Sequence, residues 1–211
     1  MNKKINKPPI FWQKAKKTLS AKDRKLSKII ESYPHDFLFS KSDPFFTLAR
    51  SIVGQQISVK AAQSVWNRLE IKVKKINPEI IITTHSSTLK SAGLSRQKVK
   101  YLKNLANAFI DKKIKINMWD KMNDEEIVQD LIQIKGIGRW TAEMFLIFNL
   151  CREDIFPLDD IGMIKGLCKL YRIAYPTDKD VIIRIGEKWK PYRSVATWYL
   201  WRSLDPIPVE Y

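Results

Sequence analysis

The chain has 211 residues, which is long enough to bury a core of its own as one domain or two small lobes. Its 38 lysines and arginines outnumber its 22 acidic residues, and the net charge of +16 favours a polyanionic partner, with a membrane surface as the competing choice. Two cysteines are too few for a disulfide scaffold or a four-cysteine iron–sulfur cluster. An apolar run of about 18 residues and a signal peptide are both lacking, so we expect a cytoplasmic protein.

The first third of the chain predicts helices that begin at recognisable caps. Residues 1–9 are rich in Lys, Asn and Pro and favour a solvated arm over a dedicated contact. From Ser20 the spacing of Leu26, Ile29 and Ile30 predicts an amphipathic helix that Pro34 ends. Asp43 and Pro44 then open another helix, with an apolar face of Phe45, Leu48 and Ile52.

A polar loop follows this second helix. It consists of Gly54, Gln55, Gln56, Ile57 and Ser58, and Ser58 is placed to cap a helix over residues 59–69. From composition alone, the two glutamines are solvated loop residues.

The middle of the chain continues the helical pattern. Residues 77–92 predict a short helix and then a turn, where His85 fits a surface turn better than a catalytic base. Gly93 ends one helix, and Ser95 caps another that runs through Phe109. We expect Lys98, Lys100 and Lys103, which follow the polar faces of that helix, to be solvated.

Residues 131–142 join two helical patterns through a Gly-x-Gly turn, and the first helix begins at Asn123 with acidic residues in its first turn. Gly136 and Gly138 let the backbone adopt conformations closed to other residues and approach a ligand closely. The second helix begins near Gly138, so its unpaired N–H groups and positive dipole end would face the turn. A phosphate fits such a turn, and Lys135 adds a cation beside it. An ordinary corner between two helices is the alternative.

Two carboxylates, Asp159 and Asp160, precede a helix that starts at Ile161. Aspartate is a preferred N-cap, so a purely structural role explains both residues without chemistry. Residues 189–202, near the C-terminus, are rich in aromatic side chains and are typical of a helix that packs in the core. With no alternating strand, repeat or Walker loop, the sequence predicts an all-α fold of about ten short helices.

Four separated motifs resemble one family. Residues 131–142 fit the pattern Leu-x-x-hydrophobic-x-Gly-hydrophobic-Gly-x-x-Thr-Ala of the helix-hairpin-helix DNA glycosylase superfamily, except that Lys135 stands where proline is usual. The loop at residues 54–58, the run at 92–102 and the C-terminal run at 189–202 resemble its alkylation-repair branch, DNA-3-methyladenine glycosylase II. The pattern Phe-Pro-x-x-Asp-hydrophobic-Gly-hydrophobic, which carries the family's catalytic aspartate, matches at Asp160. The resemblance covers residues 40 to 201.

The resemblance implies two helical lobes with the base in the cleft between them. One lobe would hold residues 1–48 and 151–211, and the other residues 49–150 with the hairpin. It implies the following site residues: Asp160 as the catalytic group; Trp140, Met144, Ile161, Trp198 and Trp201 around the base; and Gln55, Gln56, Ile57, Ser58, Lys135, Gly136, Ile137, Gly138, Arg139 and Thr141 on DNA. Gln56 matches the wedge that fills the gap left by a flipped base. Ile161 and Met144 replace aromatic residues of the family.

The function implied is that of a monofunctional glycosylase that excises alkylated purines, of the 3-methyladenine and 7-methylguanine type, from double-stranded DNA. It implies no cofactor beyond a structural Na⁺ or K⁺ held by the backbone carbonyls of Ile132, Ile134 and Ile137. We expect a monomer, associated with the nucleoid if the source is bacterial. Two rivals stay open: a helix-hairpin-helix DNA-binding protein without catalysis, and an oxidised-base glycosylase with lyase activity. That second branch places a Schiff-base lysine where this chain has Trp140.

Overall fold

The computed structural model describes residues 7–40 and 43–205, and throughout these residues the secondary structure is helical, without a strand. The all-α prediction is confirmed. The described residues form two compact units, one of residues 7–40 and 150–205 and the other of residues 43–149. Residues 1–6 of the expected N-terminal arm lie outside the described range. No helix within that range is both long enough and apolar enough to span a bilayer.

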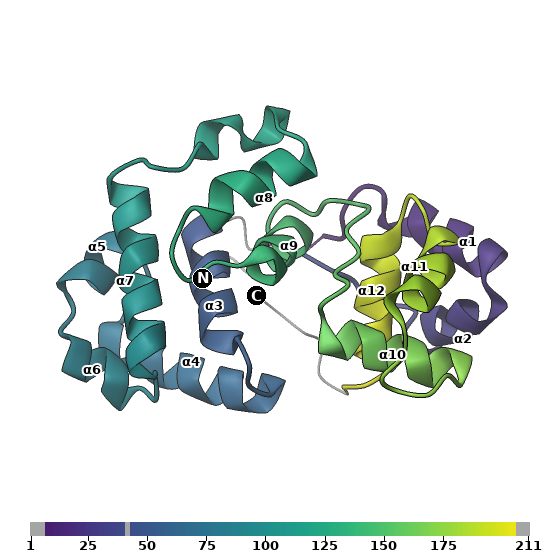
Figure 1. Ribbon diagram of the computed structural model, residues 1–211, viewed down its shortest axis with the longest axis horizontal. Coiled ribbons are helices and arrows are strands. Elements are labelled where there is room, and N and C mark those ends of the chain that lie inside the picture. The colour runs from purple at the N-terminus through teal and green to yellow at the C-terminus, as the bar shows by residue number, and fades with distance from the viewer. Residues whose placement is uncertain (1–6, 41–42, 206–211) are drawn as a thin grey trace. The chain divides into compact units, whose positions relative to one another are not determined.

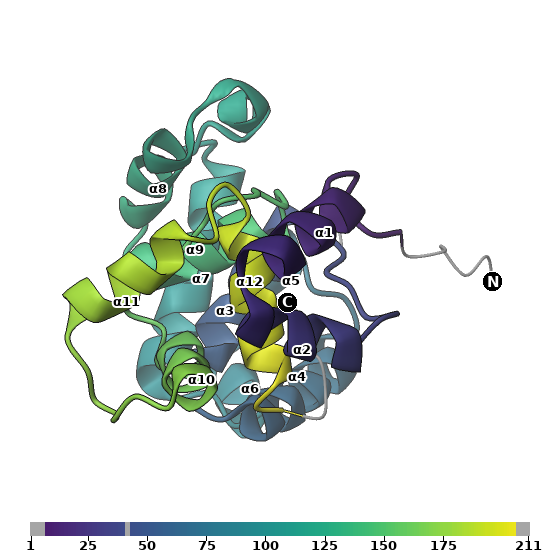
Figure 2. The same cartoon turned by 90° about the vertical axis from the view of Figure 1, so that its right-hand side faces the viewer.

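The first unit contains α1 (Trp12–Lys22), α2 (Arg24–Ser32), α10 (Ile161–Tyr171), α11 (Lys179–Glu187) and α12 (Arg193–Arg202). Its core is built on α12, in which every residue from Ser194 to Trp201 is buried. Figure 2 shows α12 beside α1, α2 and α10, and these three helices all pack against it. A Cβ at Gly166 of α10 would lie 2.9 Å from the carbonyl oxygen of Leu200, so glycine there permits close packing of the two helices.

The N-terminal helices differ from the prediction. Instead of one helix starting at Ser20, α1 ends at Lys22 and α2 begins at Arg24. Asp23 separates them because its side chain accepts hydrogen bonds from the amides of Lys25 and Leu26 and caps α2. Sequence analysis missed α1, which buries Trp12, Ala15 and Leu19 in this unit.

The carboxylate of Asp23 also joins distant parts of the first unit. Its Oδ2 accepts hydrogen bonds from the Tyr171 hydroxyl and, at 2.9 Å, from Trp189 Nε1. Burial acts to raise the pKa of Asp23, but these bonds and those from the α2 backbone outweigh burial and hold the pKa below its ordinary value of 3.8. Asp23 therefore stabilises the fold as an anion.

The second unit contains α3 (Pro44–Gly54), α4 (Val59–Val73), α5 (Pro78–Thr83), α6 (Ser86–Ser91), α7 (Arg96–Ile110), the 3₁₀ helix η1 (Ile116–Lys121), α8 (Asp124–Ile132) and α9 (Arg139–Phe148). The apolar α3 is its centre and packs against α4, α7 and α9 (Figure 1). Because α3 makes these contacts, it belongs to this unit, whose described residues start at 43 rather than at the expected residue 49.

The caps predicted for the second unit are confirmed. The side chains of Asp43, Ser58 and Ser95 each accept a backbone N–H at the start of α3, α4 and α7. Asn123 and Glu126 form a reciprocal capping box at the start of α8. His85 is exposed at the start of α6, as expected of a surface turn.

Candidate active site

Asp160 lies at the N-terminus of α10 and is held there by two N–H donors. Its Oδ1 accepts the Met163 amide at 2.5 Å and Trp201 Nε1 at 2.7 Å. The residue is 8% exposed. A Cβ at Gly162 would lie 3.2 Å from this oxygen and 3.1 Å from Trp201 Cδ1, so glycine leaves room for the pair. The result is a fixed carboxylate at the positive end of a helix dipole.

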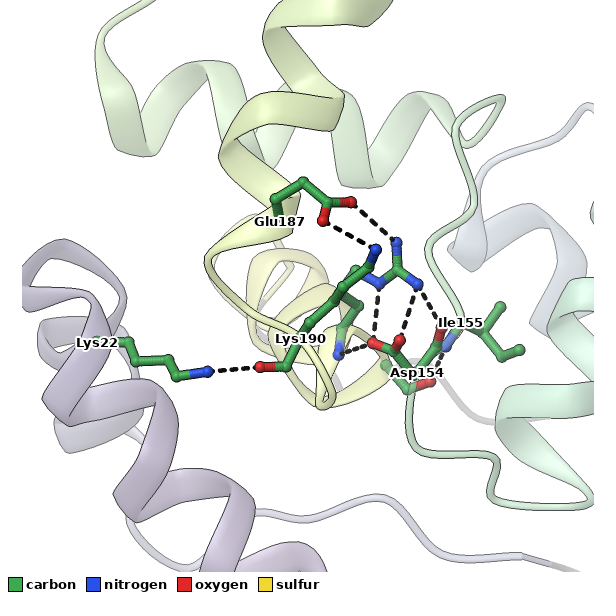
Figure 3. A network of polar contacts seen from close by, with 7 residues as sticks. Lys22, Asp154, Ile155, Glu187 and Lys190 are labelled. Carbon is green, nitrogen blue, oxygen red and sulfur yellow. Dashed lines mark hydrogen bonds and ion pairs between the residues drawn. The ribbon is translucent and has the colours of Figure 1, made fainter.

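The segment that leads to Asp160 is anchored on the start of α12 (Figure 3). Arg193 donates two parallel hydrogen bonds to Asp154, from Nε to Oδ1 and from Nη2 to Oδ2, each 2.8 Å long. The Ile155 amide donates to Ser194 Oγ at 2.8 Å. Bidentate arginine–carboxylate pairs fix orientation as well as distance. The α12 helix therefore positions Asp160 from both of its ends, through residues 193–194 and through Trp201.

Asp159 has a different environment from its neighbour. Its Oδ1 lies 2.6 Å from Lys179 Nζ, and the two side chains are 61% and 63% exposed. The helix cap is Asp160, so Asp159 does not take the capping role that its position allowed. Asp159 is a surface carboxylate and serves as the natural control for Asp160.

The residues predicted around the base lie on both units and have different environments. Trp201 contacts Asp160 directly, and Ile161, the next residue in the chain, is 58% exposed. Trp198 is 2% exposed and packs its ring against Trp12 and Tyr199, with centroid distances of 5.3 and 5.1 Å. In the second unit, Trp140 is half-buried and Met144 is buried on α9. Contact of these residues with a base stays a prediction.

The hairpin turn between α8 and α9 uses its two glycines differently. Gly136 has φ +114°, and a Cβ there would lie 2.3 Å from Tyr101 Cγ, so this position requires glycine. Gly138 is extended, with φ −101° and ψ 176°, and a Cβ there would meet no atom within 4 Å. The expectation that both glycines adopt conformations closed to other residues is therefore wrong for Gly138. Its lack of a side chain instead leaves open space beside the N-terminus of α9.

The side chains around this turn differ in their exposure to solvent. Lys135 and Arg139 are exposed, and Arg139 pairs with Glu125 at 2.6 Å. Ile137 is only 5% exposed and Thr141 only 1%, so these two residues could offer DNA little beyond their backbones.

The loop at residues 55–58, here called the wedge loop, is connected to the hairpin. Gln55 Nε2 donates to the Gly136 carbonyl at 3.0 Å and to Thr141 Oγ1 at 2.9 Å. Gln56 is exposed with φ +58°, and Ile57 is 41% exposed. Ser58 caps α4 through the Ala61 amide. Of the residues predicted to contact DNA, Gln55 thus faces the hairpin, while Gln56 and Ile57 are presented outward.

The environment of Lys98 differs from the sequence prediction. It was expected to be solvated, but it is half-buried, and its Nζ donates to the carbonyls of Val53 at 2.7 Å and Gln55 at 2.8 Å. Burial lowers its pKa. Its acceptors precede it by 45 and 43 residues, so no local pattern could have revealed the contact.

Two other kinds of chemistry find little support in the described residues. Burial raises the pKa of the Cys151 thiol to about 11, which leaves it protonated at neutral pH and a poor nucleophile. No cluster of three His, Cys, Asp or Glu residues within the described ranges could bind a metal ion. The predicted ligands of the alkali ion are backbone carbonyls rather than such side chains. The α8 helix ends at Ile132, and the carbonyls in the last turn of a helix are outside its regular hydrogen-bond pattern. The Ile134 carbonyl accepts one bond, from the Ile137 amide at 2.9 Å.

Comparisons with known proteins agree on one relationship. Residues 49–191 match the family model described as HhH-GPD superfamily base excision DNA repair protein. DNA-3-methyladenine glycosylase 1 of Schizosaccharomyces pombe is 34% identical over 188 residues, covering 85% of this chain and 81% of that protein. DNA-3-methyladenine glycosylase 2 of Escherichia coli is 28% identical, covering 75% and 57% of the two chains. The solved S. pombe 3-methyladenine DNA glycosylase in complex with abasic DNA superimposes with a TM-score of 0.81 at 33% identity, covering 90% and 96%.

Proposed function

The chain belongs to the HhH-GPD superfamily of base excision DNA repair proteins, and we propose that it is a monofunctional DNA glycosylase for alkylated purines. The names of its relatives include 3-methyladenine, and we propose lesions of the 3-methyladenine and 7-methylguanine type. Its partner is DNA, and the form we propose is a duplex that carries an alkylated base, bound by a monomer in the cytoplasm.

The placement of Asp160 is the observation that carries this proposal. Breaking an N-glycosidic bond develops positive charge on the sugar, and an anion held beside C1′ stabilises that charge. Asp160 is suited to this role because the Trp201 and Met163 donors fix its carboxylate. The same carboxylate would orient or deprotonate the attacking water. Hydrolysis then gives the free base and an abasic sugar, without a covalent intermediate.

The hairpin would bind the DNA backbone. The N-terminus of α9, with open space beside Gly138, offers a phosphate the N–H donors and the dipole that anions favour. Neutral backbone carbonyls at the end of α8 suit a hard cation such as Na⁺ or K⁺, which the negative end of that helix also favours. We propose that Ile132, Ile134 and Ile137 would hold this ion, whose charge would attract the phosphate.

The test is single-turnover release of 3-methyladenine from duplex DNA by Asp160→Asn, with Asp159→Asn as the matched control. Asparagine keeps the size and N-capping ability of aspartate, so the fold should persist while excision falls by about a hundredfold or more. Asp159→Asn should retain nearly full activity because its carboxylate is exposed and pairs with Lys179. Circular dichroism would verify that both variants are folded.

Two further measurements on the same duplex, together with base release, separate the two alternative functions. Borohydride should trap no enzyme–DNA adduct, and product strands should break only after alkali or heat treatment. A trapped adduct would indicate a lyase that uses an amine nucleophile. A folded, fully active Asp160→Asn variant would refute the mechanism, and release of no base by the wild type would favour a non-catalytic DNA-binding protein.

A further inference from the structure

Lys98 completes the hydrogen bonding at the C-terminus of α3, where the wedge loop begins. The Gln55 amide donates to the carbonyls of Ser51 and Ile52, and the Ile57 amide donates to that of Gly54. The carbonyls of Val53 and Gln55 accept from Lys98 Nζ at 2.7 and 2.8 Å. Every carbonyl from residue 51 to residue 55 therefore has a donor. A cation also suits the negative end of the α3 dipole.

The wedge loop held in this way is itself joined to the hairpin. The backbone carbonyl of Gln55 accepts from Lys98, while its side chain donates to the Gly136 carbonyl at 3.0 Å and to Thr141 Oγ1 at 2.9 Å. Gln55 thus connects α7, the wedge loop and the hairpin turn. Movement of the loop would require these bonds to break together.

The α7 helix supports the hairpin turn directly as well. The Tyr101 ring lies against Gly136, in the space that a Cβ would occupy, and Asn104 Nδ2 donates to the Lys135 carbonyl at 3.0 Å. Lys98, Tyr101 and Asn104 follow one another at three-residue spacing, so they project from one side of the helix. Figure 1 shows α7 running beside α3, against which it packs.

We propose that Lys98 is a positioning residue that fixes the wedge loop to the hairpin, so that both meet DNA as one preformed surface. The inference rests on the proposed function. Gln56 at the tip has φ +58°, a conformation that is unfavourable for a residue other than glycine. A loop in that conformation must be held by its surroundings. Preforming it lowers the entropy lost when its residues insert into a duplex.

The experiment compares Lys98→Met with Lys100→Met, which removes the same charge from an exposed position of α7. The probe is a duplex with 2-aminopurine opposite a tetrahydrofuran abasic site, because its fluorescence reports changes in the stacking of the base opposite the gap that the wedge fills. Lys98→Met should lose most of the fluorescence change and bind this duplex about tenfold more weakly than Lys100→Met, as expected from loss of hydrogen bonds to a charged group. Both variants should bind intact duplex equally well.

Excision adds a second measurement. Release of 3-methyladenine by Lys98→Met should fall on duplex DNA but hardly on single strands, where no gap needs filling. Lys98→Gln, whose amide can still donate to one carbonyl, should be intermediate and also serves if the methionine variant does not fold.

Three results bear on the proposal in different ways. Equal weakening on abasic and intact duplexes, with a shallower salt dependence, would identify Lys98 as a phosphate contact and overturn the inference. A lower melting temperature with a normal fluorescence change would reduce Lys98 to a stabilising residue and also overturn it. A wild type that releases no base, yet gives the expected fluorescence differences, would refute the proposed function while supporting the role of Lys98.

Discussion

Trp201→Phe should separate the positioning of Asp160 from its chemistry. The change removes the indole N–H that donates to Asp160 Oδ1 at 2.7 Å, in surroundings where the two residues are 7% and 8% exposed. A buried hydrogen bond to a charged group is worth about 1.5–3 kcal/mol. If the carboxylate uses all of it in the transition state, single-turnover excision should fall by about 10- to 150-fold.

The control is Trp12→Phe, the same change at another buried indole of the first unit, which packs against Trp198 and Tyr199. Both variants should lose about 1–3 kcal/mol of stability, which lowers the melting temperature by about 2–4 °C per kcal/mol. Only Trp201→Phe should slow excision beyond this shared effect. Equal rates for the two variants would refute the argument that Trp201 positions the carboxylate.

Two more predictions concern the hairpin and the pH dependence of folding. Gly136→Ala should destabilise the protein by about 1–3 kcal/mol, because φ at this residue is +114° and the added Cβ would overlap Tyr101. Gly138→Ala should leave the melting temperature unchanged but weaken binding to duplex DNA, as measured by fluorescence anisotropy. The pKa of Asp23 is lowered in the folded state, so its stabilisation is present above the unfolded pKa and is lost as the pH falls through the folded value. As the pH is lowered below about 4, the free energy of unfolding, measured by denaturant titration, should therefore fall less for Asp23→Asn than for the wild type.

The sequence predicted the helix starts of the second unit well because an N-cap is a local feature. Asp43, Ser58 and Ser95 each bind an amide within three residues, so residue type and spacing carry the information. The hairpin between α8 and α9 was predictable for the same reason. Its glycine roles were not, because the constraint at Gly136 comes partly from Tyr101 on another helix.

The first unit was harder to predict because its helices depend on distant partners. The α1 helix has a narrow apolar stripe among lysines, and Trp12 is secured by packing on α12. Trp198 and Trp201 lie one turn apart on a helix that is buried all round, so periodicity could not distinguish them. One packs on Trp12 and the other binds Asp160, and only the fold shows this difference.

Asp160 was predicted as the catalytic group from the family pattern, and its capping position is also a local feature of the sequence, whereas no local feature indicates the contacts of Lys98. Amides at an N-terminus are satisfied by a neighbouring side chain, and Asp160 accepts the amide three residues ahead. Carbonyls at a C-terminus need donors, which a long lysine side chain can bring from anywhere in the fold. Lys98 and Lys100 have equivalent settings in the α7 sequence, yet only Lys98 faces the end of α3, 45 residues earlier in the chain. Side chains that bind the carbonyls of a loop far away in the sequence are therefore visible only once the helices are placed.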